Sequence, residues 1–278
     1  MGWLFKAGWL TQAMETRIYS DMVSAHQEAG KRLGSANDRE KGHYEAVNAW
    51  IHGDFFGAVQ KWEAVLNAYP LDLFALELIH YTDVLLGDVV GQRDCVARVF
   101  NIWDESISGY EFVLGFYSFG LEENNDFFRA EEMGRRALAI RPDNPYAVHA
   151  VSHVMEMSGR QAGGIRFMQE QRKHWGTSNF ANHLWWHTAL YHLDPEQYDK
   201  AFEIVGDDKA SWFLYYSRGA SLELAGFWTE AERDLLAALD RAPDQPLILN
   251  HLGYSWVDRG INLDRGMELI QRAVDLSP

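Results

Sequence analysis

The residues best suited to chemistry in this sequence are histidines, and six of the eleven lie between positions 149 and 192. His149, His153 and Glu156 follow one another at spacings of four and three residues. On a helix, this spacing places all three side chains on one face. His183 and His187 are also four residues apart, so they too would share one face of a helix.

Two hypotheses account for these histidines. Imidazoles one helical turn apart can chelate zinc, with a carboxylate as a further ligand or general base, so the cluster could be the centre of a metal-dependent or acid–base enzyme. The spacing lacks the His-Glu-x-x-His order of zinc proteases. The other hypothesis is a polar belt, in which the histidines bond to carboxylates, backbone and ligand. We favour the belt, and therefore predict no catalytic residue, no metal and no cofactor.

The other common catalytic patterns are absent from the sequence. There is no Gly-x-Ser-x-Gly elbow, no phosphate-binding loop and no dinucleotide fingerprint. The acidic pairs Glu122-Glu123 and Asp207-Asp208 are interpreted as solvated loop residues.

A recurring pattern of small, aromatic and proline residues shows how helices would position the histidines. Gly253 follows Gly219 by 34 residues. The pattern around the first of them comprises Gly219, Leu222, Gly226, Trp228, Ala231, Leu235, Ala238 and Pro243. Small residues permit close helix crossing, glycine permits a tight turn, and proline ends a helix. This pattern resembles the tetratricopeptide repeat (TPR). It recurs less regularly upstream and predicts an all-α, TPR-like α-solenoid, a right-handed superhelix of about seven helical hairpins.

In repeats of this type, the first helix of each hairpin lines the concave groove. Counted from Pro145, the residues His149, His153 and Glu156 occupy the fifth, ninth and twelfth positions, which face the groove. Further expected groove positions are aromatic: Phe112, Phe116, Tyr216 and Tyr254. The residues that we predict to bind a ligand are His149, His153, Glu156, Trp185, His187 and Tyr216.

Residues from about 40 to 205 resemble a particular repeat family. The resemblance is carried by Glu45–Trp50 with Gly53-Asp54-Phe55, Arg93–Val99, Gly109-Tyr110 through Glu123, Ala147–Met157 with Gly159-Arg160, and His183–His187 with Ala189-Leu190. These segments are similar to the tetratricopeptide repeat protein 38 family. The resemblance implies an α-helical repeat fold and supplies no reaction.

The sequence changes character after about residue 205. Residues 206–278 resemble the ordinary TPR repeats of bacterial multi-repeat proteins, above all in the run Leu252–Asp264. We therefore divide the chain into 1–205 and 206–278, with two regular hairpins in the second part continuing the same solenoid. An alternative is an engineered fusion of TPR segments with no natural function. An uncapped last repeat also predicts a homodimer through the C-terminal hairpin.

The composition restricts the partners. The 25 basic and 40 acidic residues give a net charge of −15, which disfavours nucleic acid and anionic membranes and favours basic or amphipathic ligands.

A single cysteine, Cys95, suits a reducing compartment, and we expect a cytoplasmic protein. The first 14 residues are interpreted as a packing helix and not as a targeting signal. The predicted function is a non-catalytic scaffold that binds a protein or peptide in its groove.

Overall fold

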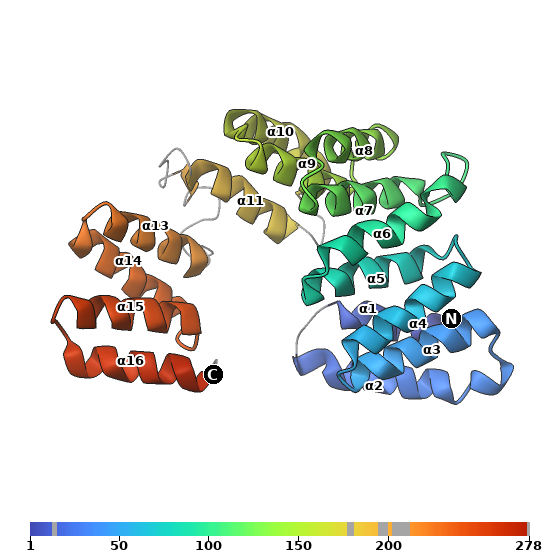
Figure 1. The fold of residues 1–278 in the computed structure, drawn as a ribbon, viewed down its shortest axis with the longest axis horizontal. Coiled ribbons are helices and arrows are strands. Elements are labelled where there is room, and N and C mark those ends of the chain that lie inside the picture. The colour runs from blue at the N-terminus through green and yellow to red at the C-terminus, as the bar shows by residue number, and fades with distance from the viewer. Residues whose placement is uncertain (13–15, 177–180, 194–199, 202–211, 277–278) are drawn as a thin grey trace. The chain divides into compact units, whose positions relative to one another are not determined.

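The computed structural model describes residues 1–12, 16–176, 181–193, 200–201 and 212–276. Within these ranges the ordered elements are helices, and no strand is found (Figure 1). The α-helices are α1 Gly2–Thr11, α2 Thr16–Gly30, α3 Asp38–Ile51, α4 Phe55–Ala68, α5 Leu73–Leu86, α6 Val89–Val99, α7 Tyr110–Glu123, α8 Phe127–Ile140, α9 Pro145–Met157, α10 Gln161–Trp175, α11 Ala181–Leu193, α13 Trp212–Leu224, α14 Trp228–Arg241, α15 Pro246–Asp258 and α16 Leu263–Leu276. The all-α prediction is confirmed.

The chain forms two compact units. The first comprises 1–160 and 167–178, and the second comprises 161–166 and 179–278. The junction predicted at 205/206 lies outside the described residues.

Aspartates set the starts of several helices. Asp54, Asp72, Asp88 and Asp126 each precede a helix and accept a hydrogen bond from the backbone N–H three residues later. Such caps satisfy backbone donors that have no partner within the helix. Helix ends in the hairpins use glycine: Gly226, after α13, has φ +87°, the left-handed conformation expected of this turn.

In the first unit, neighbouring helices pack as hairpins and the hairpins pack on one another. The pairs α3–α4, α5–α6 and α7–α8 are in contact, and α9 packs on both α7 and α8. One buried cluster joins these hairpins, with Trp62, Leu76 and Leu114 among its fully enclosed side chains. Single hairpins cannot bury both faces, so this stacking supplies the core.

The second unit contains the two regular hairpins that the repeat pattern predicted, α13–α14 and α15–α16. A Cβ placed on Gly253 would lie 2.7 Å from the carbonyl oxygen of Gly266, and one placed on Gly266 would lie 2.9 Å from that of Gly253. The backbones of α15 and α16 therefore cross too closely for any side chain at that point. Gly253 thus shows the close helix crossing that small residues of the repeat pattern permit.

The first helix packs into the first unit, as expected. Leu4 and Ala7 of α1 are buried, and α1 contacts α2, α3 and α5. The ring of Phe5 lies 4.7 Å from that of Phe74 on α5. None of the described helices has the length and apolar character needed to cross a membrane.

Asp83 on α5 is a carboxyl group held in the core, and Cys95 is buried as well. Burial, with smaller contributions from Asp88 and Glu63, raises the pKa of Asp83 to about 7 from its ordinary 3.8. Between these values the folded chain holds a proton that the unfolded chain has released. The stability that this group contributes is therefore complete below pH 3.8 and is lost as the pH rises to about 7.

Replacing Asp83 by asparagine should remove this pH dependence. We expect Asp83→Asn to raise the free energy of unfolding by about 1–2 kcal/mol at pH 8 and to change it little at pH 4, because only the ionised carboxylate is costly to bury. Urea unfolding at the two pH values measures the difference. The exposed Asp21→Asn is the control, and equal effects of Asp83→Asn at both pH values would contradict the assignment.

Candidate ligand-binding surface

The first helices of two hairpins in the first unit, α7 and α9, carry a row of aromatic and imidazole rings. We use the term α7–α9 row for Phe112 and Phe119 on α7 together with Tyr146, His149 and His153 on α9. Local sequence fixes α9: the Asn144 side chain accepts hydrogen bonds from the N–H groups of Tyr146 and Ala147, and Pro145 occupies the first turn. These contacts define where α9 begins and therefore the positions of its residues in the row.

The two predicted histidines of α9 lie together, as their spacing indicated. Their ring centroids are 4.4 Å apart, and Phe119 lies 4.9 Å from His149 and 5.3 Å from His153. His149 is 8% exposed, whereas His153 keeps about a quarter of its side chain accessible. Glu156 is half-buried at the end of the same helix. Of the two histidines, His153 is therefore the one that a ligand can reach.

The row continues toward α5 through Tyr146. Its hydroxyl donates a hydrogen bond of 3.0 Å to Glu77 Oε1. Burial raises the pKa of Glu77, although the bond from Tyr146 opposes this effect. Phe116, expected in the groove, is instead almost wholly buried against His80 and Tyr146. Phe112, also expected there, is half-buried and lies 6.2 Å from Tyr146.

The interpretation of Glu122 and Glu123 as solvated loop residues is wrong. Both belong to the last turn of α7, and Glu122 is only 4% exposed. Its carboxylate lies 3.5 Å from His153 Nδ1. Tertiary packing of α9 against the end of α7 covers this carboxylate, which the sequence alone could not show.

The second unit carries its own histidine pair on α11. His183 Nε2 and His187 Nε2 are 3.0 Å apart, so one ring donates to the other. His187 is buried and His183 is exposed. Trp186 stacks on His183 with ring centroids 5.7 Å apart, and Trp185 is half-buried.

Tyr216, predicted as a ligand contact, lies in a polar network between α13 and α15. Its hydroxyl is 3.1 Å from His251 Nδ1, and His251 Nε2 is 2.7 Å from Glu223 Oε2. Arg259 pairs with the other carboxylate oxygen of Glu223 at 2.7 Å. Tyr254 on α15 is 63% exposed.

Repeat numbering contains a signal that could have identified Glu223. Counted from Trp212, Tyr216 and Glu223 stand at the fifth and twelfth positions, the same positions that His149 and Glu156 hold on α9. His251 and Arg259 have no equivalent signal, because their contacts depend on how α15 packs on α13.

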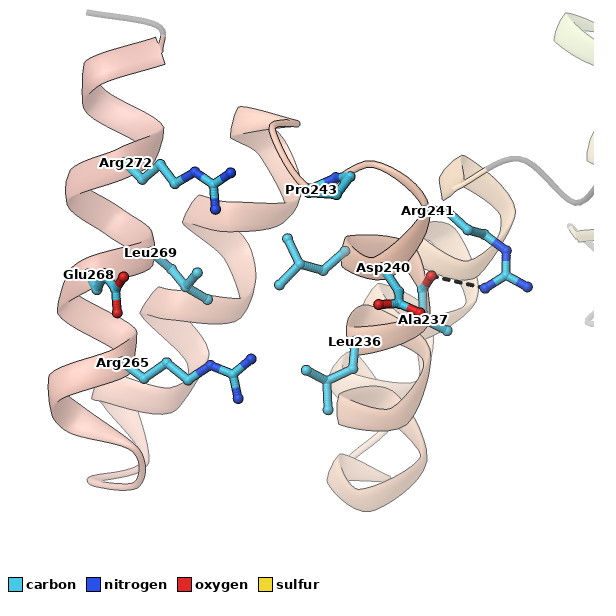
Figure 2. Close-up of a pocket in the computed structure, with 10 residues that line it drawn as sticks. Leu236, Ala237, Asp240, Arg241, Pro243, Arg265, Glu268, Leu269 and Arg272 are labelled. Carbon is cyan, nitrogen blue, oxygen red and sulfur yellow. Dashed lines mark hydrogen bonds between the residues drawn. The ribbon is translucent and has the colours of Figure 1, made fainter.

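In the second unit, α14 and α16, the second helices of the two hairpins, form a separate hollow of about 590 Å³ (Figure 2). Leu236 and Asp240 of α14 line one side, and Arg265 and Leu269 of α16 line the other. The guanidinium of Arg241 donates to the Ala237 carbonyl at 3.1 Å. None of the predicted ligand-binding residues lines this hollow.

The paired helices, close glycine crossings and repeated positions define a TPR-like α-solenoid. The structure is similar to a TPR protein from Parabacteroides merdae, with a TM-score of 0.60 and 13% identity over 92% of this chain and 93% of that one. It is also similar to the human IFIT1 dimer with PPP-AAAA, with a TM-score of 0.60 and 12% identity over 97% of this chain and 71% of that one. A third similar structure is the APC/C hetero-tetramer Cut9–Hcn1, with a TM-score of 0.53 and 13% identity over 94% of this chain and 50% of that one.

These likenesses establish the fold at the level of TPR proteins. No family model matches the chain, so the narrower resemblance to the tetratricopeptide repeat protein 38 family stays a prediction.

Proposed function

We propose that the protein is a non-catalytic scaffold that binds a protein or peptide segment through the first helices of its hairpins, with the α7–α9 row as its main contact surface. The observation that carries this proposal is the side-by-side arrangement of Phe119, His149 and His153, with rings 4.4–5.3 Å apart. Aromatic and imidazole rings offer large contact areas that lose little conformational entropy on binding.

The charge around the row favours a basic, amphipathic segment. Glu123 and Glu156 are half-buried near its accessible end, and the whole chain carries a net charge of −15. A lysine or arginine of the ligand would meet carboxylates there, while its apolar side chains would meet Phe112 and Phe119. Such complementarity mainly accelerates association and selects the partner. Nucleic acid is disfavoured by the same charge.

Contacts in the second unit would be made by Trp185 and Tyr216, and His187 would support them indirectly. The exposed position of Tyr254 and the Tyr216–His251–Glu223 network support a ligand surface of the same kind on α13 and α15. Because His187 is buried, it would act by orienting His183 through their shared hydrogen bond.

A displayed library of random 12-residue peptides, selected on the whole chain, would test the proposal. We expect enrichment of peptides that combine aromatic residues with lysine or arginine. Phe119→Ala should weaken the best peptide about tenfold, which is typical of an aromatic contact residue. Fluorescence polarisation measures the Kd, and the affinity should fall further as salt is raised.

The matched control is Phe128→Ala. Phe128 lies on α8, the second helix of its hairpin, and is 83% exposed, so its loss removes an exposed ring from a different surface. It should leave the Kd unchanged. The proposal fails if no peptide is enriched, or if Phe128→Ala weakens binding as much as Phe119→Ala does in variants of equal helicity.

A further inference from the structure

The end of α7 meets the middle of α9 at a cluster of three possible metal donors. Glu122, Glu123 and His153 each offer one donor atom, and these atoms lie within 4.8 Å of one another. The cluster lies wholly in the first unit. It differs from the histidine cluster suggested by the sequence, because both carboxylates come from α7.

The buried carboxylate of Glu122 distinguishes this cluster from ordinary surface acids. The residue is 4% exposed, and its Oε2 atom has no hydrogen-bond partner among the residues that the structure describes. The Nδ1 atom of His153 lies 3.5 Å from this oxygen. A buried carboxylate oxygen without a hydrogen bond is costly, so a positive charge beside it would stabilise this arrangement.

The second carboxylate lies close to the first. Glu123 follows Glu122 directly in the chain, and one of its carboxylate oxygens lies within 4.8 Å of the donor atoms of both Glu122 and His153. The two acids also occupy the C-terminal end of α7, where the helix dipole adds negative potential. A cation between these side chains would reduce the repulsion between the two carboxylates and the unfavourable effect of the helix dipole on them.

We propose that Glu122, Glu123 and His153 bind one divalent transition-metal cation such as Zn²⁺ or Mn²⁺. Two carboxylates neutralise the charge of the ion, and an imidazole selects such metals over Mg²⁺ and Ca²⁺, which prefer oxygen ligands throughout. Bonds of about 2.0–2.2 Å require donor atoms about 3–4 Å apart. Glu123 is half-exposed, so its side chain can move the short distance needed. Three protein donors leave positions for water or for a ligand carboxylate.

The direct test is equilibrium dialysis of the untagged full chain against ZnCl₂ or MnCl₂, with the bound metal measured by mass spectrometry. We expect about one ion per chain and an increase in Tm with metal concentration. The conservative variants Glu122→Gln and His153→Gln should each weaken binding by about 10- to 100-fold, because even groups that only support metal ligands have effects of this size.

The controls remove one carboxylate or one imidazole elsewhere in the same unit. Glu132 on α8 and His52 after α3 are both exposed, so Glu132→Gln and His52→Gln should bind metal like the native chain. MgCl₂ and CaCl₂ should give no Tm increase at the same concentration. The proposal is overturned if the native chain binds no more metal than Glu122→Gln, or if the controls lose as much binding as the site variants. The peptide selection described above is made without added metal, so failure of either idea leaves the other standing.

Discussion

Asp72→Ala is expected to destabilise the first unit by about 3–5 kcal/mol, because this carboxylate has three partners in a buried position. It accepts hydrogen bonds from His43 Nε2 at 2.8 Å, from Arg39 Nε at 2.5 Å and from the backbone N–H of Ala75 at 3.1 Å. Removing it would leave His43, which is fully buried, without a hydrogen-bond partner at Nε2 and α5 without its cap. Urea unfolding followed by circular dichroism measures the loss.

Asp54→Ala is the matched control for the capping contribution. Asp54 caps α4 by the same bond to the backbone, 2.9 Å from Gly57 N, and its side chain has no ion pair in the described residues. Its loss should cost only about 1 kcal/mol. Equal effects of the two substitutions would show that Asp72 acts as a cap alone.

The effect of Asp72→Ala should also depend on pH. Burial by itself raises the pKa of Asp72, but the hydrogen bonds from His43 and Arg39 outweigh it and hold the pKa well below the ordinary 3.8. The stability that the carboxylate contributes is therefore complete above pH 3.8 and is lost as the pH falls below that value. The difference between native and Asp72→Ala chains should shrink in that acid range.

Gly120→Ala is the second large effect, with an expected loss of about 2–3 kcal/mol. A Cβ at this position of α7 would lie 2.8 Å from Arg93 Cα and 3.1 Å from both Arg93 N and Gln92 O, all backbone atoms of α6. Backbone cannot move aside as a flexible side chain can. The clash therefore exceeds the gain of about 1 kcal/mol that alanine brings to a helix interior.

Gly115→Ala on the same helix separates the clash from the helix propensity. The nearest atom to its added Cβ would be Tyr146 Cβ at 3.3 Å, so only a small adjustment is needed. We expect its stability to stay within about 1 kcal/mol of the native value. Thermal and urea unfolding of the two variants test this, and a Gly120→Ala chain as stable as Gly115→Ala would show that α6 and α7 do not approach so closely.

The sequence predicted the fold through its small residues. The spacing of Gly219 and Gly253 predicted two regular hairpins, and the contact between Gly253 and Gly266 gives the physical reason, since these helices cross with no room for a side chain. The left-handed turn at Gly226 was also predictable from a residue without a Cβ, because only glycine adopts that backbone conformation freely.

The candidate site was predictable only in part. His149 and His153 share a helix face, and their spacing alone places them together. Their neighbour Phe119 comes from α7, and no spacing within α9 indicates it. Glu122 and Glu123 were misinterpreted, because an acidic pair at the end of a helix is normally exposed, whereas tertiary packing buries Glu122 and brings His153 of α9 to within 3.5 Å of it.

By itself, then, the sequence determined the features that depend on local geometry: helices, caps, hairpin turns and the faces shared by residues three or four positions apart. Tertiary structure alone decided which faces meet. It buried Glu122 beside His153, paired Asp72 with His43, and joined Tyr216 to His251 across two helices. The physical reason is that burial and charge pairing depend on residues distant in the chain, and local periodicity carries no information about their approach.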